Sequence, residues 1–260
     1  MVVQLYHFEG CVTHSCASVC FKHSILGVSE PFSMSVYTRL PRIIQQCILF
    51  LFGKLILRLY EKEVKERLCN ISGNVFIDVG ASIGSYSFML AKQFKIVIAV
   101  EPNPKTVLKL EKTIRQRKME NIRVYPYALS NRDGEAPFYL DHTFGRLEGS
   151  ADTLESAFHY RPGSNRKKDL TVKGEDECVV ETRRFDSLFK ELQTIDLVKI
   201  DVEGSEFKVL EGMPKSLGNI RNLIIELHDR ERKGELERFL LARNFQIEWL
   251  GKSHVMAMQR

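Results

Sequence analysis

Two acidic residues and two glycines in the first half of the chain have the types and spacing of a ligand-binding site. Asp78 lies near the end of a short apolar run, Gly80 and Gly84 follow it, and Glu101 comes directly after a second apolar run. Continuously apolar runs of this length are typical of parallel strands buried on both faces of a sheet. Because glycine lets the backbone approach a ligand closely, and ligands bind at the carboxyl ends of such strands, the pattern predicts a cofactor pocket.

The spacing of the glycines distinguishes between two kinds of adenosine-containing cofactor. Dinucleotide-binding folds seat a pyrophosphate with the pattern G-x-G-x-x-G, whereas three residues separate Gly80 from Gly84. S-adenosylmethionine has no phosphate but carries a positive sulfonium, which favours an acidic side chain such as Asp78 nearby. Glu101 can accept hydrogen bonds from both ribose hydroxyls. We therefore expect S-adenosylmethionine as the cofactor. The expected contacts are Asp78, Gly80, Ala81, Ser82, Gly84, Glu101, Pro102 and Ala128.

The second half of the chain contributes side chains that can accept a proton. Asp201 stands at the end of the fourth expected strand, Glu203 follows two residues later, and His228 ends the fifth strand. The ends of these strands face one crevice, so we expect all three in the catalytic site, with His228 or Glu203 as general base. The structural alternatives are His228 as a strand cap and Glu206 as a stabiliser of a helix start.

The same three catalytic candidates also have the ligand types of a divalent metal site. Their spacing in the sequence matches no recognised metal signature, and we predict no metal. Glu226 raises a related question, because an acid in an otherwise buried strand needs a partner or a ligand.

Strand and helix patterns alternate from residue 75 onward. This alternation predicts a Rossmann-like α/β fold, with a mostly parallel seven-stranded sheet covered by helices on both faces. The last two strands, joined through Gly251, predict an antiparallel hairpin at the sheet edge, and the adenine ring is expected against Tyr127–Ser130. We place strands at 75–79, 96–100, 122–126, 195–200, 222–227, 246–249 and 254–258, and helices at 84–93, 104–118, 205–211 and 233–243.

Three segments precede or interrupt this alternation. Residues 1–33 form a poorly patterned leader, and Met34, which follows it, is an alternative start of the protein. Residues 34–70 form an amphipathic helical extension. The extension either covers the edge of the core or lies on a membrane surface through residues 40–60; its longest uncharged run, eleven residues, is too short to span a bilayer. Within the domain 71–260, the insert 134–190 is either a substrate-selecting lid or a solvated loop.

Composition limits the class of protein. With 260 residues, of which 44% are hydrophobic, the chain can bury one substantial core, and a net charge of +5 does not indicate a uniformly basic nucleic-acid binder. The six cysteines include no CxxC pair, which argues against a zinc site, and no secretory signal peptide is recognisable. We expect a cytoplasmic protein that contacts a membrane, if at all, peripherally.

Over about Tyr60 to Met258 the chain resembles the FkbM-type family of class I S-adenosylmethionine-dependent methyltransferases. The resemblance implies the class I methyltransferase fold and methyl transfer, commonly to an oxygen, with Asp78, Gly80, Gly84 and Glu101 in the cofactor site. Ser82 stands where the family usually carries Asn, which should alter the hydrogen bonds of the turn without abolishing the site. The matching motifs are Phe76–Ser87, Val100–Pro104, Tyr127–Gly134, Arg184–Leu188, Asp196–Glu206 and Ile224–His228, with Lys199–Gly204 the most family-specific.

We expect an enzyme that O-methylates a hydroxyl on a sugar, glycolipid or secondary metabolite, with a small-molecule or glycan acceptor and no nucleic acid. One rival is an RNA methyltransferase, suggested by basic residues of the insert, where aromatic residues for base stacking are sparse. Another is a membrane-associated binding module without catalysis, suggested by residues 40–60; the presence of Asp78 and Glu101 speaks against a vestigial pocket. The basic residues are Arg161, Arg166, Lys167 and Lys168.

Overall fold

The computed structural model describes residues 61–140, 152–154 and 177–260, and every structural statement below concerns these residues. The chain divides into two compact units, residues 1–62 and 63–260, and the second unit carries the sheet and the site. Most of the predicted leader, extension and insert therefore lies outside the described residues. In the part that is described, no helix has the length and apolar character that crossing a membrane requires.

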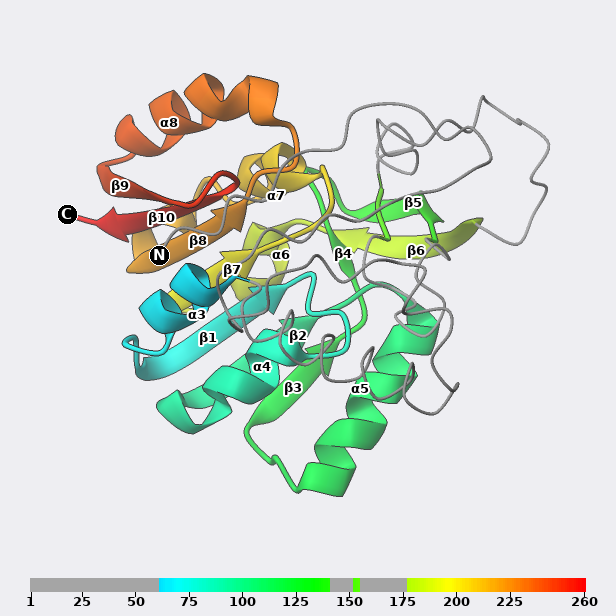
Figure 1. Ribbon diagram of the computed structural model, residues 1–260. Coiled ribbons are helices and arrows are strands. Elements are labelled where there is room, and N and C mark those ends of the chain that lie inside the picture. The colour runs from blue at the N-terminus through cyan, green and yellow to red at the C-terminus, as the bar shows by residue number, and fades with distance from the viewer. Residues whose placement is uncertain (1–60, 141–151, 155–176) are drawn as a thin grey trace, which may run out of the picture. The chain divides into compact units, whose positions relative to one another are not determined.

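Seven strands form one sheet, in the order β3-β2-β1-β7-β8-β10-β9 (Figure 1). The pairs from β3 to β8 are parallel, whereas β10 is antiparallel to both β8 and β9. The strand order reverses between β1 and β7, and open α/β sheets bind ligands at the carboxyl ends of strands at such a point. The bounds are β1 Gly73–Val79, β2 Phe94–Val100, β3 Ile122–Tyr125, β7 Leu197–Ile200, β8 Asn222–Glu226, β9 Phe245–Leu250 and β10 His254–Gln259.

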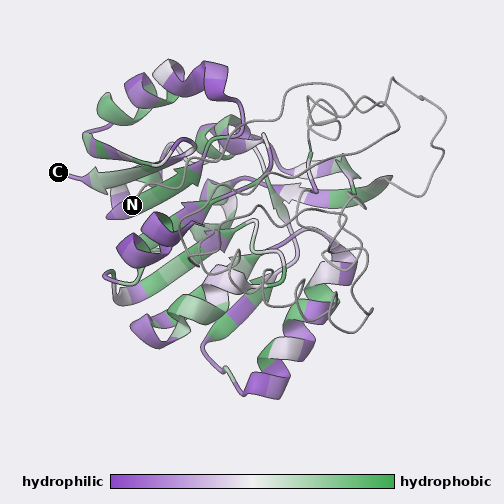
Figure 2. Cartoon of the chain, in the orientation of Figure 1, coloured by the Kyte–Doolittle hydropathy of each residue, from purple (hydrophilic) through white to green (hydrophobic). Residues whose placement is uncertain are grey.

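Helices cover both faces of this sheet, because its central strands carry apolar side chains on both faces. Phe76 packs with residues of α3, α4 and α5, whereas Ile77 packs with residues of α6, α7 and α8. In Figure 2 the central strands are largely green, while α5 and α8 carry purple, hydrophilic positions. The bounds are α3 Lys62–Leu68, α4 Ser85–Leu90, α5 Pro104–Arg117, α6 Phe185–Phe189, α7 Glu206–Glu211 and α8 Lys233–Leu241.

The sequence-based prediction of the fold is confirmed: a Rossmann-like, mostly parallel seven-stranded sheet with helices on both faces and an antiparallel hairpin at one edge. The order within the hairpin places β10 inside the sheet and β9 at its edge. The helix predicted at 84–93 is shorter, because α4 ends at Leu90 and a 3₁₀ turn, Ala91–Gln93, completes the segment. The fourth strand, predicted from residue 195, begins at Leu197, and Ile195 forms only an isolated bridge.

A second, three-stranded sheet follows β3. Its order is β4-β6-β5, with β6 parallel to β4 and antiparallel to β5. The strands β5 and β6 lie within the predicted insert 134–190, whereas the two-residue β4 precedes it and is too short to recognise from periodicity. The bounds are β4 Ala128–Leu129, β5 Gly134–Tyr139 and β6 Glu177–Arg183.

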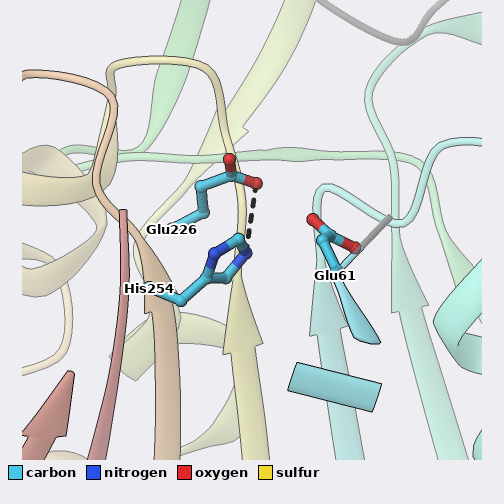
Figure 3. A group of neighbouring side chains, drawn as sticks. All are labelled: Glu61, Glu226 and His254. Atoms are coloured by element: carbon cyan, nitrogen blue, oxygen red, sulfur yellow. Dashed lines mark ion pairs between the residues drawn. The ribbon is translucent and has the colours of Figure 1, made fainter. Parts of the chain in front are cut away.

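Two acids of the domain, Glu226 and Asp186, have structural partners. Figure 3 shows the Glu226 carboxylate pointing toward the imidazole of His254, and Glu226 Oε2 lies 3.4 Å from His254 Nε2. The two residues are directly opposite in the β8–β10 ladder. His254 is therefore the partner that an acid in a buried strand such as β8 was expected to need. Asp186 at the start of α6 accepts hydrogen bonds from the amides of Lys215 and Ser216, so it ties α6 to the chain before β8.

Candidate active site

The turn between β1 and α4 requires glycine at Gly80. Its φ is +76°, and a Cβ built there would lie 1.8 Å from the carbonyl oxygen of Asp201. The amides of Gly80 and Ala81 both donate to the carbonyl oxygen of Val100 at the end of β2. A side chain at residue 80 would therefore push apart the ends of β1 and β7, where the predicted cofactor and catalytic residues meet.

The same turn continues through Ser82 and Gly84, both with positive φ. Gly84, at φ +85°, precedes α4, and a Cβ there would lie 2.5 Å from Leu110 Cδ1. Ser82 has φ +49°, a left-handed conformation that Asn adopts more readily than Ser. This backbone geometry is a physical reason for the family's Asn at that position, and in it the Ser82 amide donates to Glu101.

Glu101 receives one backbone hydrogen bond on each carboxylate oxygen. The Ser82 amide donates to Oε2 at 2.9 Å and the Asn103 amide donates to Oε1 at 2.8 Å. The side chain is buried, and this desolvation, which outweighs the two amide bonds, raises the pKa of Glu101 to about 8. Each oxygen keeps a second lone pair, so the ionised form can accept two further hydrogen bonds from a diol.

A cavity at the carboxyl ends of β1, β2 and β7 collects most of the predicted cofactor contacts. Five of them line it, namely Gly80, Ser82, Glu101, Pro102 and Ala128. Ala81, Gly84 and Asp78 are not among its lining residues. The opposite wall is apolar and suits an adenine ring, with Tyr127, Leu129, Phe138 and Leu154.

Sequence reasoning missed Asp152, which comes from the insert and lines the same cavity. Its Oδ2 accepts a hydrogen bond of 2.6 Å from the side-chain amide of Asn103, the residue that also caps α5. No local pattern points to Asp152, because its hydrogen-bond partner Asn103 is 49 positions away in the chain. Asn103 was detectable in principle, since Asn followed by Pro is a helix-start signal.

Asp78 lies on β1, two residues before Gly80. It is fully buried, its Oδ2 accepts a hydrogen bond of 2.6 Å from the Ser87 hydroxyl, and its Oδ1 has no hydrogen-bond partner among the described residues. Burial raises the pKa of the Asp78 carboxyl, an effect opposed by the ammonium of Lys199 and by the Ser87 hydroxyl. Lys199, buried on β7, lies in the Lys199–Gly204 motif but was not predicted as a site residue.

The three predicted catalytic residues converge, and Glu206 joins them. Asp201 and Glu203 line the cofactor cavity, and His228 Nε2 lies 3.2 Å from Glu203 Oε2 and 4.0 Å from Asp201 Oδ1. On its other side, His228 Nδ1 lies 2.8 Å from Oε1 of Glu206, whose side chain is 1% exposed. Glu206 Oε1 also accepts from the Gly204 amide, so it stabilises the turn before α7 and orients the imidazole as well.

These contacts determine the charge of the cluster. Burial disfavours the imidazolium, but hydrogen bonds to Glu203 and Glu206 prevail and raise the pKa of His228 to about 11. For Asp201, burial opposes ionisation, but Lys199 and His228 lower the pKa of the carboxyl; Lys199 Nζ lies 2.8 Å from Asp201 Oδ2. At neutral pH the cluster therefore holds His228 as a cation between two carboxylates.

The geometry also bears on the metal alternative raised from the sequence. Asp201, Glu203 and His228 each offer one ligand atom, and these three atoms all lie within 4.8 Å of one another, close enough to share an ion. A metal would have to displace the proton on His228 Nε2, which Glu203 stabilises.

The raised pKa of His228 predicts how stability depends on pH. An ordinary histidine titrates near 6.5 and folded His228 near 11, so between these values only the folded chain keeps the proton. The free energy of unfolding should therefore fall as pH rises through this window, by at most about 1.4 kcal/mol per pH unit from this residue. Urea denaturation from pH 6.5 to 9.5 should show a shallower decline for His228→Gln than for the wild type; parallel profiles would contradict the ion pairs.

Comparison with known proteins adds an independent finding. A model of the methyltransferase FkbM domain matches residues 78–247. The 2-O-methyltransferase NoeI of Sinorhizobium fredii is 26% identical over 162 residues, which cover 60% of this chain and 64% of NoeI. The hexuronic acid methyltransferase AglP of Haloferax volcanii is 27% identical over 175 residues, which cover 66% of this chain and 61% of AglP. The match thus spans less than two thirds of either relative.

Among solved structures, a crystal structure of methyltransferase FkbM from Methylobacillus flagellatus is similar, with a TM-score of 0.49 and 16% identity. The matched region covers 71% of this chain and 43% of the Methylobacillus chain. The matched range of the family model, more than half of the 260 residues, includes the glycine turn, Glu101 and the cluster from Asp201 to His228. The strand order found here is that of the class I methyltransferase fold. The protein belongs to the FkbM methyltransferase domain family.

Proposed function

We propose that this protein is an S-adenosylmethionine-dependent methyltransferase that methylates a hydroxyl group of a sugar-like acceptor. The observation that carries the proposal is one cavity shared by two kinds of residue. Glu101 and the glycine turn line its cofactor side, and Asp201 and Glu203 line the other side, next to His228. A protein that only binds the cofactor would need Glu101 and the glycine turn but not Asp201 and Glu203.

The residues present fit the cofactor. Glu101 offers free lone pairs on both oxygens to the ribose hydroxyls, and Gly80 keeps the backbone clear of a side chain where the ligand must approach. Asp78 has a buried oxygen without a described hydrogen-bond partner, beneath the turn that would hold the amino-acid part. When bound, S-adenosylmethionine supplies an electrophilic methyl group on a sulfonium sulfur.

The acidic cluster supplies the proton acceptor. As a hydroxyl oxygen attacks the methyl group, the oxygen gains positive charge and its proton becomes strongly acidic, so a carboxylate is a sufficient base. Glu203 is the carboxylate in this position, because His228 already carries its protons and lies 3.2 Å away as a charged partner. Glu203 would take up the hydroxyl proton as the methyl group passes from the sulfonium sulfur to the acceptor oxygen.

The class of acceptor comes from the relatives. The name of NoeI, a 2-O-methyltransferase, supports an oxygen acceptor, and the name of AglP, a hexuronic acid methyltransferase, supports a carbohydrate. The two rival functions rest on the basic residues of the insert and on residues 40–60. Both groups lie outside the described residues, so neither rival gains support from the structure.

Two measurements test the proposal in sequence. Isothermal titration of the purified full chain with S-adenosylmethionine and S-adenosylhomocysteine should show binding. Transfer of a labelled methyl group should then be measured with a panel of methyl glycosides, methyl glycuronides and glycolipids, and with transfer RNA as the comparison. A folded chain that binds neither cofactor form would refute the proposal, and transfer to RNA but not to glycans would replace it with the RNA function.

A further inference from the structure

Three described residues of the insert, Asp152–Leu154, form a short strap across the site. The backbone of Thr153 pairs with Tyr139 of β5, with N–H to O distances of 2.8 and 3.0 Å in the two directions. The Thr153 side chain is 1% exposed. The strap is therefore part of the folded core of the small sheet, although it lies within the segment with the weakest sequence pattern.

Each side of the strap contacts a different half of the site. Asp152 accepts a hydrogen bond of 2.6 Å from the Asn103 side chain, and the Asn103 amide donates to Glu101. The Thr153 hydroxyl donates a hydrogen bond of 2.6 Å to the carbonyl oxygen of Glu203. Hydrogen bonds thus connect the cofactor carboxylate, through the strap, to the turn that carries Glu203.

The turn at Glu203 needs such support. Glu203 has φ +50° and Gly204 has φ +105°, and a non-glycine residue in the left-handed region costs about 1 kcal/mol or more. Two side chains hold the peptide group between Glu203 and Gly204: Glu206 accepts from its N–H, and the Thr153 hydroxyl donates to its carbonyl oxygen. The direction of the Glu203 carboxylate follows from this backbone conformation.

We propose that Thr153 is a positioning residue for the methyl transfer, whose hydroxyl holds the Glu203 turn so that the carboxylate faces His228 and the acceptor. This inference rests on the proposed function, because Glu203 is there the proton acceptor. Thr153 itself contacts no reacting atom. Its role predicts that removing only the hydroxyl misdirects Glu203 while the cofactor side of the cavity keeps its shape.

The test uses the charge of His228 as a reporter and needs no acceptor. In the full chain labelled with ¹⁵N-histidine, the His228 resonances are assigned with His228→Gln and followed from pH 6 to 11. Thr153→Val keeps the side-chain shape but removes the donor, and should lower the proton affinity of His228 at least about tenfold. Thr153→Ser, which restores a hydroxyl, should titrate as the wild type does.

A double-mutant cycle separates positioning from general destabilisation. If Thr153 acts through Glu203, then Thr153→Val added to Glu203→Gln should change the His228 titration no further than Glu203→Gln alone. Additive effects, or a wild-type titration in Thr153→Val, would overturn the proposal. Should the valine variant fail to fold, Thr153→Ala provides the same loss of the hydroxyl with a smaller side chain.

Cofactor binding keeps this test distinct from that of the proposed function. Thr153→Val should bind S-adenosylhomocysteine with wild-type affinity, since the Asn103 and Glu101 contacts remain. With an acceptor from the glycan panel, kcat should fall while KM for the cofactor stays unchanged. If the wild type binds no S-adenosylhomocysteine, the proposed function fails, whereas the His228 titration still decides whether Thr153 positions Glu203.

Discussion

At a pH above 8, where Glu101 is ionised, Glu101→Gln should weaken the binding of S-adenosylhomocysteine about 100-fold, since each of two hydrogen bonds to a charged acceptor contributes about 1.5 kcal/mol. The substitution removes the charge and one acceptor oxygen, and its amide group would face the N–H of Ser82 or Asn103, which are donors as well. Isothermal titration measures the affinity, and thermal unfolding verifies that the variant is folded. Glu120→Gln, which removes a carboxylate from an exposed turn, should bind as the wild type does.

The pH dependence of the same binding gives a second result. The pKa of Glu101 is raised to about 8, so near neutral pH most of the unliganded protein carries a protonated Glu101. Ribose hydroxyls donate to the ionised carboxylate, and a proton therefore competes with the ligand. Affinity should rise with pH by up to about tenfold per unit below pH 8 and level off above it. This dependence should disappear in Glu101→Gln; a wild-type affinity independent of pH would contradict the role of Glu101.

Glu203→Gln should lower kcat for methyl transfer by about 10²- to 10⁴-fold, the usual contribution of a general base. The amide keeps the shape of the side chain and the backbone turn but cannot accept the hydroxyl proton. Binding of S-adenosylhomocysteine should change less than about threefold, because the ribose contacts lie on the Glu101 side. Initial rates with the acceptor identified in the glycan panel measure the effect.

His228 provides the decisive comparison for Glu203. If the imidazolium only orients Glu203, His228→Gln should retain more activity than Glu203→Gln. A larger loss in His228→Gln would make the imidazole the base and would refute the assignment of Glu203. Glu191→Gln, whose side chain is 87% exposed, serves as the control and should leave both kcat and KM unchanged.

Local patterns were sufficient to predict the fold and the cofactor side of the cavity. Val75–Val79 and Ile96–Val100 are continuously apolar except for Asp78, because parallel strands are buried on both faces, and Gly80 must be glycine because the carbonyl of Asp201 fills the place of a side chain. Periodicity failed for short elements: β4 has two residues, and α6 has five, too few to show a period.

The sequence by itself determined that β1, β2, β7 and β8 end at one edge of a sheet, and therefore that Glu101, Asp201, Glu203 and His228 lie near one cavity. Only the tertiary structure decided the protonation state and the contacts of each of these residues. Protonation depends on distances and burial between residues far apart in the chain. Contacts with Glu203 and Glu206, 25 and 22 residues earlier in the chain, raise the pKa of His228, and Thr153, 50 residues before Glu203, donates a hydrogen bond to the Glu203 carbonyl. Such charges and contacts arise when the strands pack together, so no local pattern records them.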